Sequence, residues 1–129
     1  MSFRAYIAAE VQRLASPEAQ QAIGNLLALS PLVIGDLIDE FWRARNADIR
    51  AGIVFVIAQF GDETALEFFI SALDDVHDQT WMNALDGLVN IGSPAVIKRL
   101  TTFMVSINPD DIRGAWTMEA IEQISHALS

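Results

Sequence analysis

The chain of 129 residues carries 8 basic and 17 acidic side chains, which gives a net charge of −9, and 52% of its residues are apolar or aromatic. The apolar content excludes a disordered chain, and the lack of cysteine excludes disulfides and thiolate zinc sites. The charge argues against a nucleic-acid-binding protein, and a chain of this length forms one domain that buries about two-thirds of its unfolded surface.

No stretch of the sequence is apolar for long enough to cross a bilayer. The longest, residues 26–38, is interrupted by a Ser-Pro pair, Gly35 and Asp36, and is well short of the roughly 20 apolar residues that a spanning helix needs. The N-terminal residues lack the compact apolar run of a signal peptide, because polar residues interrupt them from Glu10 onward. We therefore expect a soluble, cytoplasmic protein with no membrane partner.

Apolar residues recur at three- and four-residue spacing along almost the whole chain, which is the pattern of amphipathic helices, and no segment shows the alternation of a strand. Eight such stripes follow one another, at residues 3–14, 22–29, 37–42, 53–60, 66–73, 84–91, 97–104 and 116–124. Ser-Pro pairs begin at Ser16, Ser30 and Ser93, which suits serine as an N-cap and proline in the first turn. The sequence predicts an all-α chain of eight helices.

The stripes also repeat with a period of 31 residues. Four apolar positions of residues 22–29 recur in residues 53–60 and again in residues 84–91. The motifs Ser30-Pro31 and Asp48-Ile49-Arg50 recur 63 residues later as Ser93-Pro94 and Asp111-Ile112-Arg113, close to twice that period. Two-helix units of this size cannot bury their apolar faces alone and must stack, as in an α-solenoid.

The run from Ile49 to Asp62 resembles the first helix and closing turn of a HEAT repeat, with its Ile-Arg pair and its terminal Gly-Asp. Residues 80–94 are similar but have Trp81 where that family has arginine, and Arg113 begins a last helix that lacks the closing glycine. The resemblance implies a short right-handed α–α superhelix over residues 1–129. We expect a cap helix at 1–15, repeats at 17–45, 47–75 and 78–106, and a final helix at 110–128.

The same resemblance carries expectations about individual residues. The arginine of a HEAT repeat usually pairs with an aspartate of a neighbouring repeat, so Arg50 and Arg113 are expected to have structural roles. Some HEAT-like proteins assist bilin attachment to phycobiliproteins and others excise alkylated bases from DNA, so an accessory or lyase-type enzyme is one alternative function. The fold by itself indicates no particular activity.

No residue pattern indicates a catalytic, cofactor or metal site. The glycines lie singly, and there is no nucleophile elbow and no His-Glu-x-x-His motif. His77 lies in the acidic run of residues 74–78, but the ligand spacing of a metal site is missing, and Asp78 is expected to cap a helix that begins near Thr80. His126 is expected to be solvated near the C-terminus. We expect no cofactor and no metal.

The large aromatic side chains have two interpretations. Trp42 follows an apolar stripe and is expected to pack in the core with its indole N–H at the rim; the alternative is an exposed anchor for a partner, because tryptophan is enriched at interface hot spots. Trp81 and Trp116 begin helices and are expected to pack against the preceding repeat. Phe68 falls beside its stripe, and a contact at the flank of the core is expected.

The charge is distributed unevenly, because residues 51–97 contain seven acidic residues and no basic one. In HEAT repeats the second helices usually line the concave face, so the resemblance implies an acidic strip there. Its eight residues are Asp36, Asp39, Glu40, Glu63, Glu67, Asp74, Asp75 and Asp78. Such a strip would attract a basic protein and repel nucleic acid. An acidic surface that only confers solubility is the alternative.

The leading hypothesis is a non-catalytic protein–protein interaction module with an acidic face that binds a basic protein partner. Its most specific form is a bacterial immunity protein, or antitoxin, that neutralises a toxin domain. A self-assembling adaptor is a further alternative besides the enzyme, because Phe3, Tyr6 and the high apolar content leave both a monomer and a homodimer open.

Overall fold

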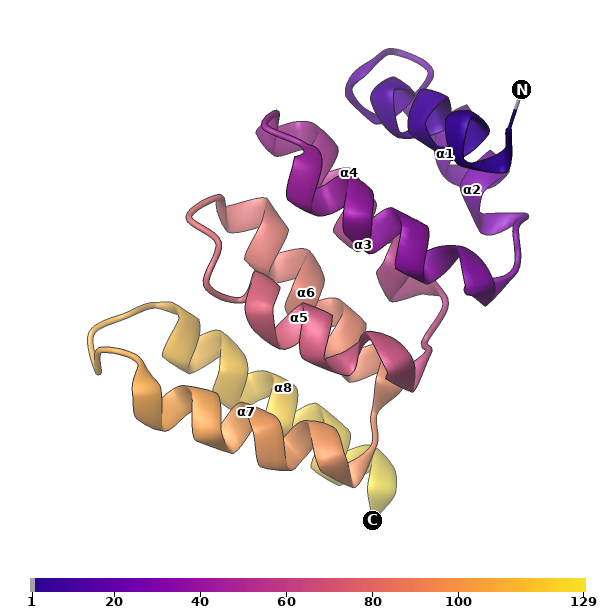
Figure 1. Ribbon diagram of the computed structural model, residues 1–129. Coiled ribbons are helices and arrows are strands. Elements are labelled where there is room, and N and C mark those ends of the chain that lie inside the picture. Colours follow the sequence, from indigo (N-terminus) through magenta and orange to yellow (C-terminus); the bar gives the residue numbers. More distant parts are fainter. Residues whose placement is uncertain (1) are drawn as a thin grey trace.

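The computed structural model describes residues 2–129, and within that range the chain forms eight α-helices and no strand (Figure 1). The helices are α1 (Phe3–Gln12), α2 (Ala19–Leu27), α3 (Ile34–Arg43), α4 (Ala47–Gln59), α5 (Leu66–Ala72), α6 (Asp78–Ile91), α7 (Pro94–Ser106) and α8 (Arg113–Leu128). Short 3₁₀ turns follow α1 (Arg13–Ala15) and precede α3 (Pro31–Val33) and α5 (Glu63–Ala65). The predicted all-α chain of eight helices is confirmed.

The helices stack in two layers (Figure 1). Helices α2, α4, α6 and α8 pack side by side in sequence, and we call them the first-helix layer. Helices α1, α3, α5 and α7 form the second-helix layer, in which α1 contacts α3, α5 contacts α7, and an edge-to-face pair of phenylalanines joins α3 to α5. This stacked, two-layer arrangement is the α-solenoid that the sequence predicts.

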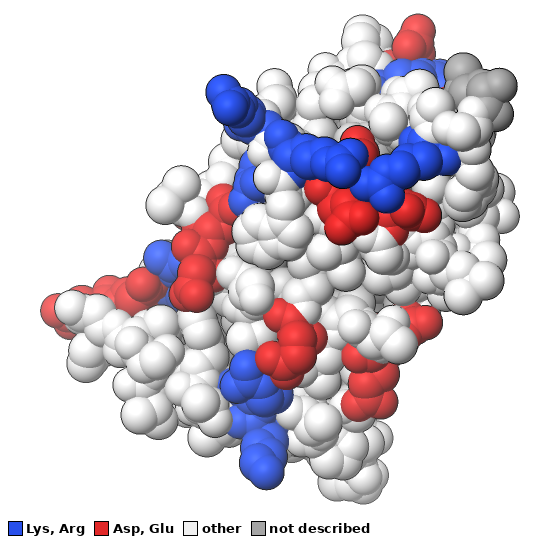
Figure 2. All heavy atoms as spheres, in the orientation of Figure 1, with Lys and Arg blue, Asp and Glu red and all other residues white. Residues whose placement is uncertain are grey.

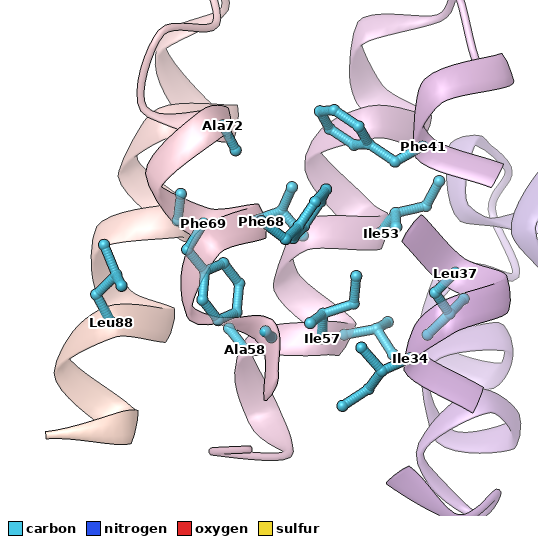
Figure 3. Close-up of a cluster of buried hydrophobic side chains, with 14 of the residues drawn as sticks. Ile34, Leu37, Phe41, Ile53, Ile57, Ala58, Phe68, Phe69, Ala72 and Leu88 are labelled. Carbon is cyan, nitrogen blue, oxygen red and sulfur yellow. The ribbon is translucent and has the colours of Figure 1, made fainter. Parts of the chain in front are cut away.

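The side chains buried between the two layers recur with the 31-residue period of the sequence. Two positions of that period are completely buried in all three copies: Ala22, Ile53 and Ala84 at the first, and Leu26, Ile57 and Leu88 at the third. Figure 3 shows part of this interior, where side chains of α3, α4, α5 and α6 meet. Burial of such residues drives the stacking, because each large aliphatic side chain contributes about 1.5–3 kcal/mol when it leaves water.

Two asparagines of α6 connect the first helices of adjacent units, and the sequence patterns gave no indication of this role. The side-chain amide of Asn83 donates to the backbone oxygen of Ala51 at 2.9 Å, and that of Asn90 donates to the oxygen of Ala58 at 3.0 Å. Both acceptors lie in α4, 32 residues earlier. The bond of the buried Asn83 fixes the register of α6 on α4, because a buried polar group is stable only when it is partnered. Asn90, which is exposed, repeats the contact near the end of the helix.

Arg50 holds the C-terminal end of α3. Its guanidinium donates to the backbone oxygens of Phe41 and Ala44 at 2.9 and 3.2 Å, lies 3.9 Å from the centre of the Phe41 ring, and pairs with Asp75 at 2.7 Å. The expected pairing with an aspartate therefore exists. However, Asp75 belongs to the same predicted unit, 47–75, as Arg50, and the neighbouring unit is contacted through its carbonyl oxygens instead.

Arg113 compensates for the missing arginine at position 81. It reaches from α8 to the end of α5, where it donates to the backbone oxygens of Leu73 and Asp75 at 2.8 and 3.3 Å. On the way its guanidinium lies 5.8 Å from the centre of the buried Trp81 ring. Its carboxylate partner is Asp111, only two residues earlier, so the expected pairing with an aspartate of a neighbouring unit is not made. The carbonyl oxygens that Arg113 holds lie in the unit 47–75, beyond the adjacent unit 78–106.

The start of α6 differs from the prediction. The helix begins at Asp78 with His77 in the N-cap position, so Asp78 is not the cap of a helix that starts near Thr80. The carboxylate of Asp78 instead accepts a hydrogen bond from the indole N–H of Trp81 at 3.1 Å. The helix thus begins two residues earlier than predicted, and Asp78 lies in its first turn, where its carboxylate is within reach of the Trp81 indole three residues later.

In the part of the chain that the structure describes, no single helix has the length and apolar character to span a membrane. The pair formed by Ala19–Leu27 and Pro31–Arg43 passes that test of length and composition when the two helices are taken together, but it is bent by 112°.

Candidate protein-binding surfaces

Three of the eight carboxylates predicted to bind a partner lie on α3 and have arginine neighbours. Asp36 and Asp39 accept hydrogen bonds from Arg4 of α1 at 3.2 and 3.3 Å. Glu40 lies 3.5 Å from Arg43, one turn later on the same helix. The positive charge of α1 and of the end of α3 therefore offsets this part of the predicted acidic strip.

Two further predicted residues lie at the start of α5 and contact α7. Glu67 accepts two hydrogen bonds from Arg99, at 2.9 and 2.8 Å, and this contact lowers the pKa of the Glu67 carboxyl. Glu63 accepts a hydrogen bond from the hydroxyl of Ser93 at 2.7 Å. These contacts run between adjacent units of the second-helix layer, and they keep α5 and α7 in register.

The remaining predicted residues surround the end of α5 and the start of α6. Asp75 is half-buried beside Arg50. Burial alone would raise the pKa of Asp75, but the hydrogen bonds from Arg50 and from the backbone of His77, with the charge of Arg50, lower it below its usual value. Asp78 binds the Trp81 indole. Asp74 is exposed and forms no ion pair within residues 2–129.

Five of the eight predicted carboxylates thus have an arginine within 4 Å: Asp36, Asp39, Glu40, Glu67 and Asp75. In the orientation of Figure 1, α5 and α7 lie in front of α6 and α8, and Figure 2 shows that basic and acidic side chains lie next to one another on this face. Both signs of charge therefore occur on the second-helix layer.

A groove of about 480 Å³ opens on the second-helix layer where α3 and α5 end. We call it the Trp42 groove. Its lining residues are Phe41, Trp42, Arg50, Ser71, Ala72, Asp74, Asp75 and Val76. The Arg50–Asp75 ion pair forms part of its wall, while Trp42 and Val76 are exposed at its rim, 58% and 95% respectively. The groove is thus mainly apolar, with one free carboxylate at Asp74.

The expected burial of Trp42 in the core is wrong, because more than half of its side chain is exposed. The indole rests edge-on against two rings, with centroid distances of 5.0 Å to Phe41 and 6.4 Å to Phe68. Phe68 is buried, so the expected contact at the flank of the core is confirmed. The core beneath Trp42 is already filled by Phe41 and Phe68, which leaves the larger indole on the outside.

The other two tryptophans lie together at the C-terminal end of the array. Trp81 is buried, and the rings of Trp81 and Trp116 meet edge-to-face with 6.0 Å between centroids. Trp116 therefore packs against the preceding unit, as predicted, although it remains partly exposed. This pair is structural, since its main contact is internal.

A second groove, of about 520 Å³, lies on the opposite, first-helix layer. We call it the first-helix groove. It is lined by Gln20, Ile23, Asp48, Ala51, Gly52, Phe55, Gln79, Asn83 and Asp86. This groove was not predicted from the sequence, although the repeat contains a signal for it. Asp48, Gly52 and Phe55 share one face of α4, and the equivalent positions of α6, 31 residues later, are Gln79, Asn83 and Asp86.

A model of HEAT repeats matches residues 34–121, from the start of α3 into α8. The chain belongs to the HEAT-repeat family. A comparison with curated protein sequences finds no match. HEAT repeats generally mediate protein–protein interactions, because stacked repeats expose long surfaces on both layers. The Trp42 groove lies entirely within the matched residues, and so does the first-helix groove apart from Gln20 and Ile23.

The HEAT array offers no arrangement suited to metal chemistry in the described range. No group of three or more His, Asp or Glu side chains in residues 2–129 could hold a metal ion. His77, the histidine of the acidic run, has its Nδ1 atom 2.9 Å from the hydroxyl of Thr80, within the first turn of α6. Within the described residues, the Trp42 groove and the first-helix groove each combine exposed apolar side chains with carboxylates.

Proposed function

We propose that this HEAT-repeat chain is a non-catalytic protein-binding module, and that its partner places an apolar side chain in the Trp42 groove and a lysine or arginine beside Asp74. The single observation that carries the proposal is the exposure of Trp42, 58%, at the rim of an open apolar groove. A large indole in that position exposes apolar surface to water until a partner covers it.

The support under Trp42 favours binding, because an anchor that is already held in place loses little entropy when a partner arrives. Phe41 and Phe68 hold the indole edge-on from below, and Arg50 fixes Phe41 from the other side through its ring and its backbone oxygen. Tryptophans in such preformed sites are the residues that most often dominate the binding energy of an interface.

The charge around the groove favours a basic partner. Arg50 is paired with Asp75, so the groove wall is close to neutral, and Asp74 adds a free negative charge at the rim. The chain as a whole carries −9, which accelerates encounter with a cationic protein and makes the rate depend on salt. Of the eight carboxylates predicted for partner binding, Asp74 is the one that we propose as a direct contact.

In its most specific form, the proposal is that the module is a bacterial immunity protein that acts in the cytoplasm and neutralises a basic toxin domain. The supporting features are the small size of the chain, its net negative charge and the lack of a catalytic motif in its sequence. Neutralisation requires a tight one-to-one complex, for which a rigid aromatic anchor and complementary charge are suitable.

The test uses purified wild-type chain and Trp42→Ala as bait in lysates of the native host, with salt elution and mass spectrometry. Phe3→Ala is the matched control, because Phe3 is an aromatic residue of nearly equal exposure, 57%, on α1. We expect a basic protein that binds wild type and Phe3→Ala alike, and that binds Trp42→Ala about 30-fold more weakly, corresponding to a hot spot of about 2 kcal/mol.

Two results would overturn the proposal. One is a partner that binds wild type and Trp42→Ala equally, which would show that the Trp42 groove is not the interface. The other is a wild-type dimer in light scattering that Trp42→Ala converts to a monomer, because the groove would then be covered by a second copy of the chain. If the partner proves to be acidic, the electrostatic part of the proposal is wrong.

A further inference from the structure

The first-helix groove combines apolar surface with two carboxylates that form no ion pair within residues 2–129. Ile23 of α2 and Phe55 of α4 provide the apolar part, and Phe55 is 39% exposed. Asp48 lies in the first turn of α4 and Asp86 on α6, so one carboxylate stands on each of the two central helices. The groove thus spans three neighbouring helices of the first-helix layer.

Most of the basic side chains of the protein are engaged elsewhere, and the other two, Arg45 and Lys98, do not line this groove. Among residues 2–129, six arginines form ion pairs, and all of their partners lie outside this groove: Arg4, Arg13, Arg43, Arg50, Arg99 and Arg113. None of the nine lining residues is basic, and neither Asp48 nor Asp86 forms an ion pair within the described chain. The positive charge that balances the second-helix layer is therefore missing on this side.

A smaller depression extends the negative surface toward α8. It shares Asp86 with the first-helix groove and is also lined by Trp116, Glu119 and Gln123. Asp86 thus lies between two depressions, and burial by its neighbours raises the pKa of its carboxyl. A nearby cation would reverse that effect, because an opposite charge stabilises the ionised carboxylate.

We propose that the first-helix groove binds a basic amphipathic segment of a protein partner, which places an apolar side chain against Ile23 and Phe55 and cations beside Asp48 and Asp86. The occupant follows from charge complementarity, since a cation-free groove with two carboxylates favours lysine or arginine over any anionic ligand. A second copy of the chain would bring its own net charge of −9 and is disfavoured.

This surface is separate from the Trp42 groove, which opens on the other layer, so either can fail without the other. The partner of the Trp42 groove could continue around the array to reach the first-helix groove, but the inference does not require it. The test therefore uses a defined probe in place of an unidentified partner.

The probe is a synthetic amphipathic helical peptide of leucine and lysine, titrated into isotope-labelled full chain and followed by NMR. We expect the amide signals of Gly52, Gln79 and Asn83 to shift, while the indole N–H signal of Trp42 stays in place. A peptide of the same length with glutamate in place of lysine should produce no shifts.

Two double variants localise the contact. Asp48→Asn with Asp86→Asn should weaken binding of the lysine peptide about 5- to 10-fold, the effect of losing two exposed ion pairs. Asp110→Asn with Glu122→Gln removes the same charge from exposed positions outside the groove and should change binding less than about 2-fold, the level expected for charges that contact nothing.

The proposal is wrong if the control variant weakens binding as much as the groove variant, because attraction would then depend only on net charge. It is equally wrong if the Trp42 indole shifts more than the groove signals, or if the lysine peptide produces no shifts at all. None of these outcomes affects the bait experiment with Trp42→Ala, so failure here and failure of the proposed function are distinguishable. Circular dichroism confirms that each variant is folded.

Discussion

Gly87 is the position where a single added methyl group should disturb the stacking of the two layers. It lies in the interior of α6, facing Phe69 of α5. A methyl group there would lie 2.5 Å from the tip of the Phe69 ring and 2.7 and 2.8 Å from the two adjacent ring carbons. Non-bonded carbon atoms normally approach to about 3.5–4.0 Å, so all three contacts are about 1 Å too short.

Two opposing effects decide the stability of Gly87→Ala. Alanine in place of glycine inside a helix gains about 1 kcal/mol from backbone entropy and propensity. Overpacking a core costs about 1–3 kcal/mol, and the upper end applies here because Phe69 is only 1% exposed and cannot turn outward. We expect a net loss of about 1–2 kcal/mol, the difference between the upper cost and the propensity gain.

Gly24 provides the matched comparison. It also lies inside a helix, α2, but a methyl group there would have no atom within 4 Å outside its own helix. Gly24→Ala should therefore stabilise the protein by about 1 kcal/mol. Urea unfolding followed by circular dichroism measures both variants, and Phe69→Leu should offset part of the loss in Gly87→Ala. Equal stability of the two alanine variants would refute the packing argument.

Three further variants probe single side chains. Replacing Arg113 by methionine should lower the free energy of unfolding by about 1–2 kcal/mol, seen as a lower melting temperature, because two carbonyl oxygens of the α5 end lose their donor. Arg50 helps to lower the pKa of Asp75 below 3.8, so the ionised carboxylate stabilises the fold above that pH and the benefit is lost as pH falls below it. The difference between the urea midpoints of wild type and Arg50→Met should therefore narrow below pH 3.8 without vanishing, because Arg50 also donates to the carbonyl oxygens of Phe41 and Ala44. The pKa of Asp86 is raised above 3.8, so its charged form opposes folding at neutral pH, and Asp86→Asn should raise the urea midpoint at pH 7 but not at pH 3.

The hydropathy pattern carried most of the fold prediction, because burial in a stacked helical array is periodic. Ala22, Ile53 and Ala84 are spaced 31 residues apart in the sequence, and all three are completely buried. A residue at the centre of an apolar stripe has no alternative position once the helix packs. The segments that resemble HEAT repeats in the sequence lie on α4, on α6 and at the start of α8, all within the residues that the HEAT-repeat model matches.

The candidate sites were harder to predict, because they depend on side chains at the edges of those stripes. Trp42 sits beside Phe41, and a stripe does not specify which of two adjacent aromatic residues fills the core. Arg4 reaches Asp36, and Arg99 reaches Glu67, each across a separation of 32 residues. A separation of about one repeat length therefore brings opposite charges together, and a net charge taken over a segment of sequence does not contain that information.

Arg113 also determines how the array can come apart. In a regular solenoid each unit contacts only its immediate neighbours, so a terminal helix can fray while the rest stays folded. Here α8 reaches back past α6 to the end of α5, so its detachment would leave the Leu73 and Asp75 carbonyl oxygens without their donor and uncover the Trp81 ring. The last helix is therefore coupled to the middle of the protein, and removing it by truncation should destabilise the central helices as well as the C-terminal end.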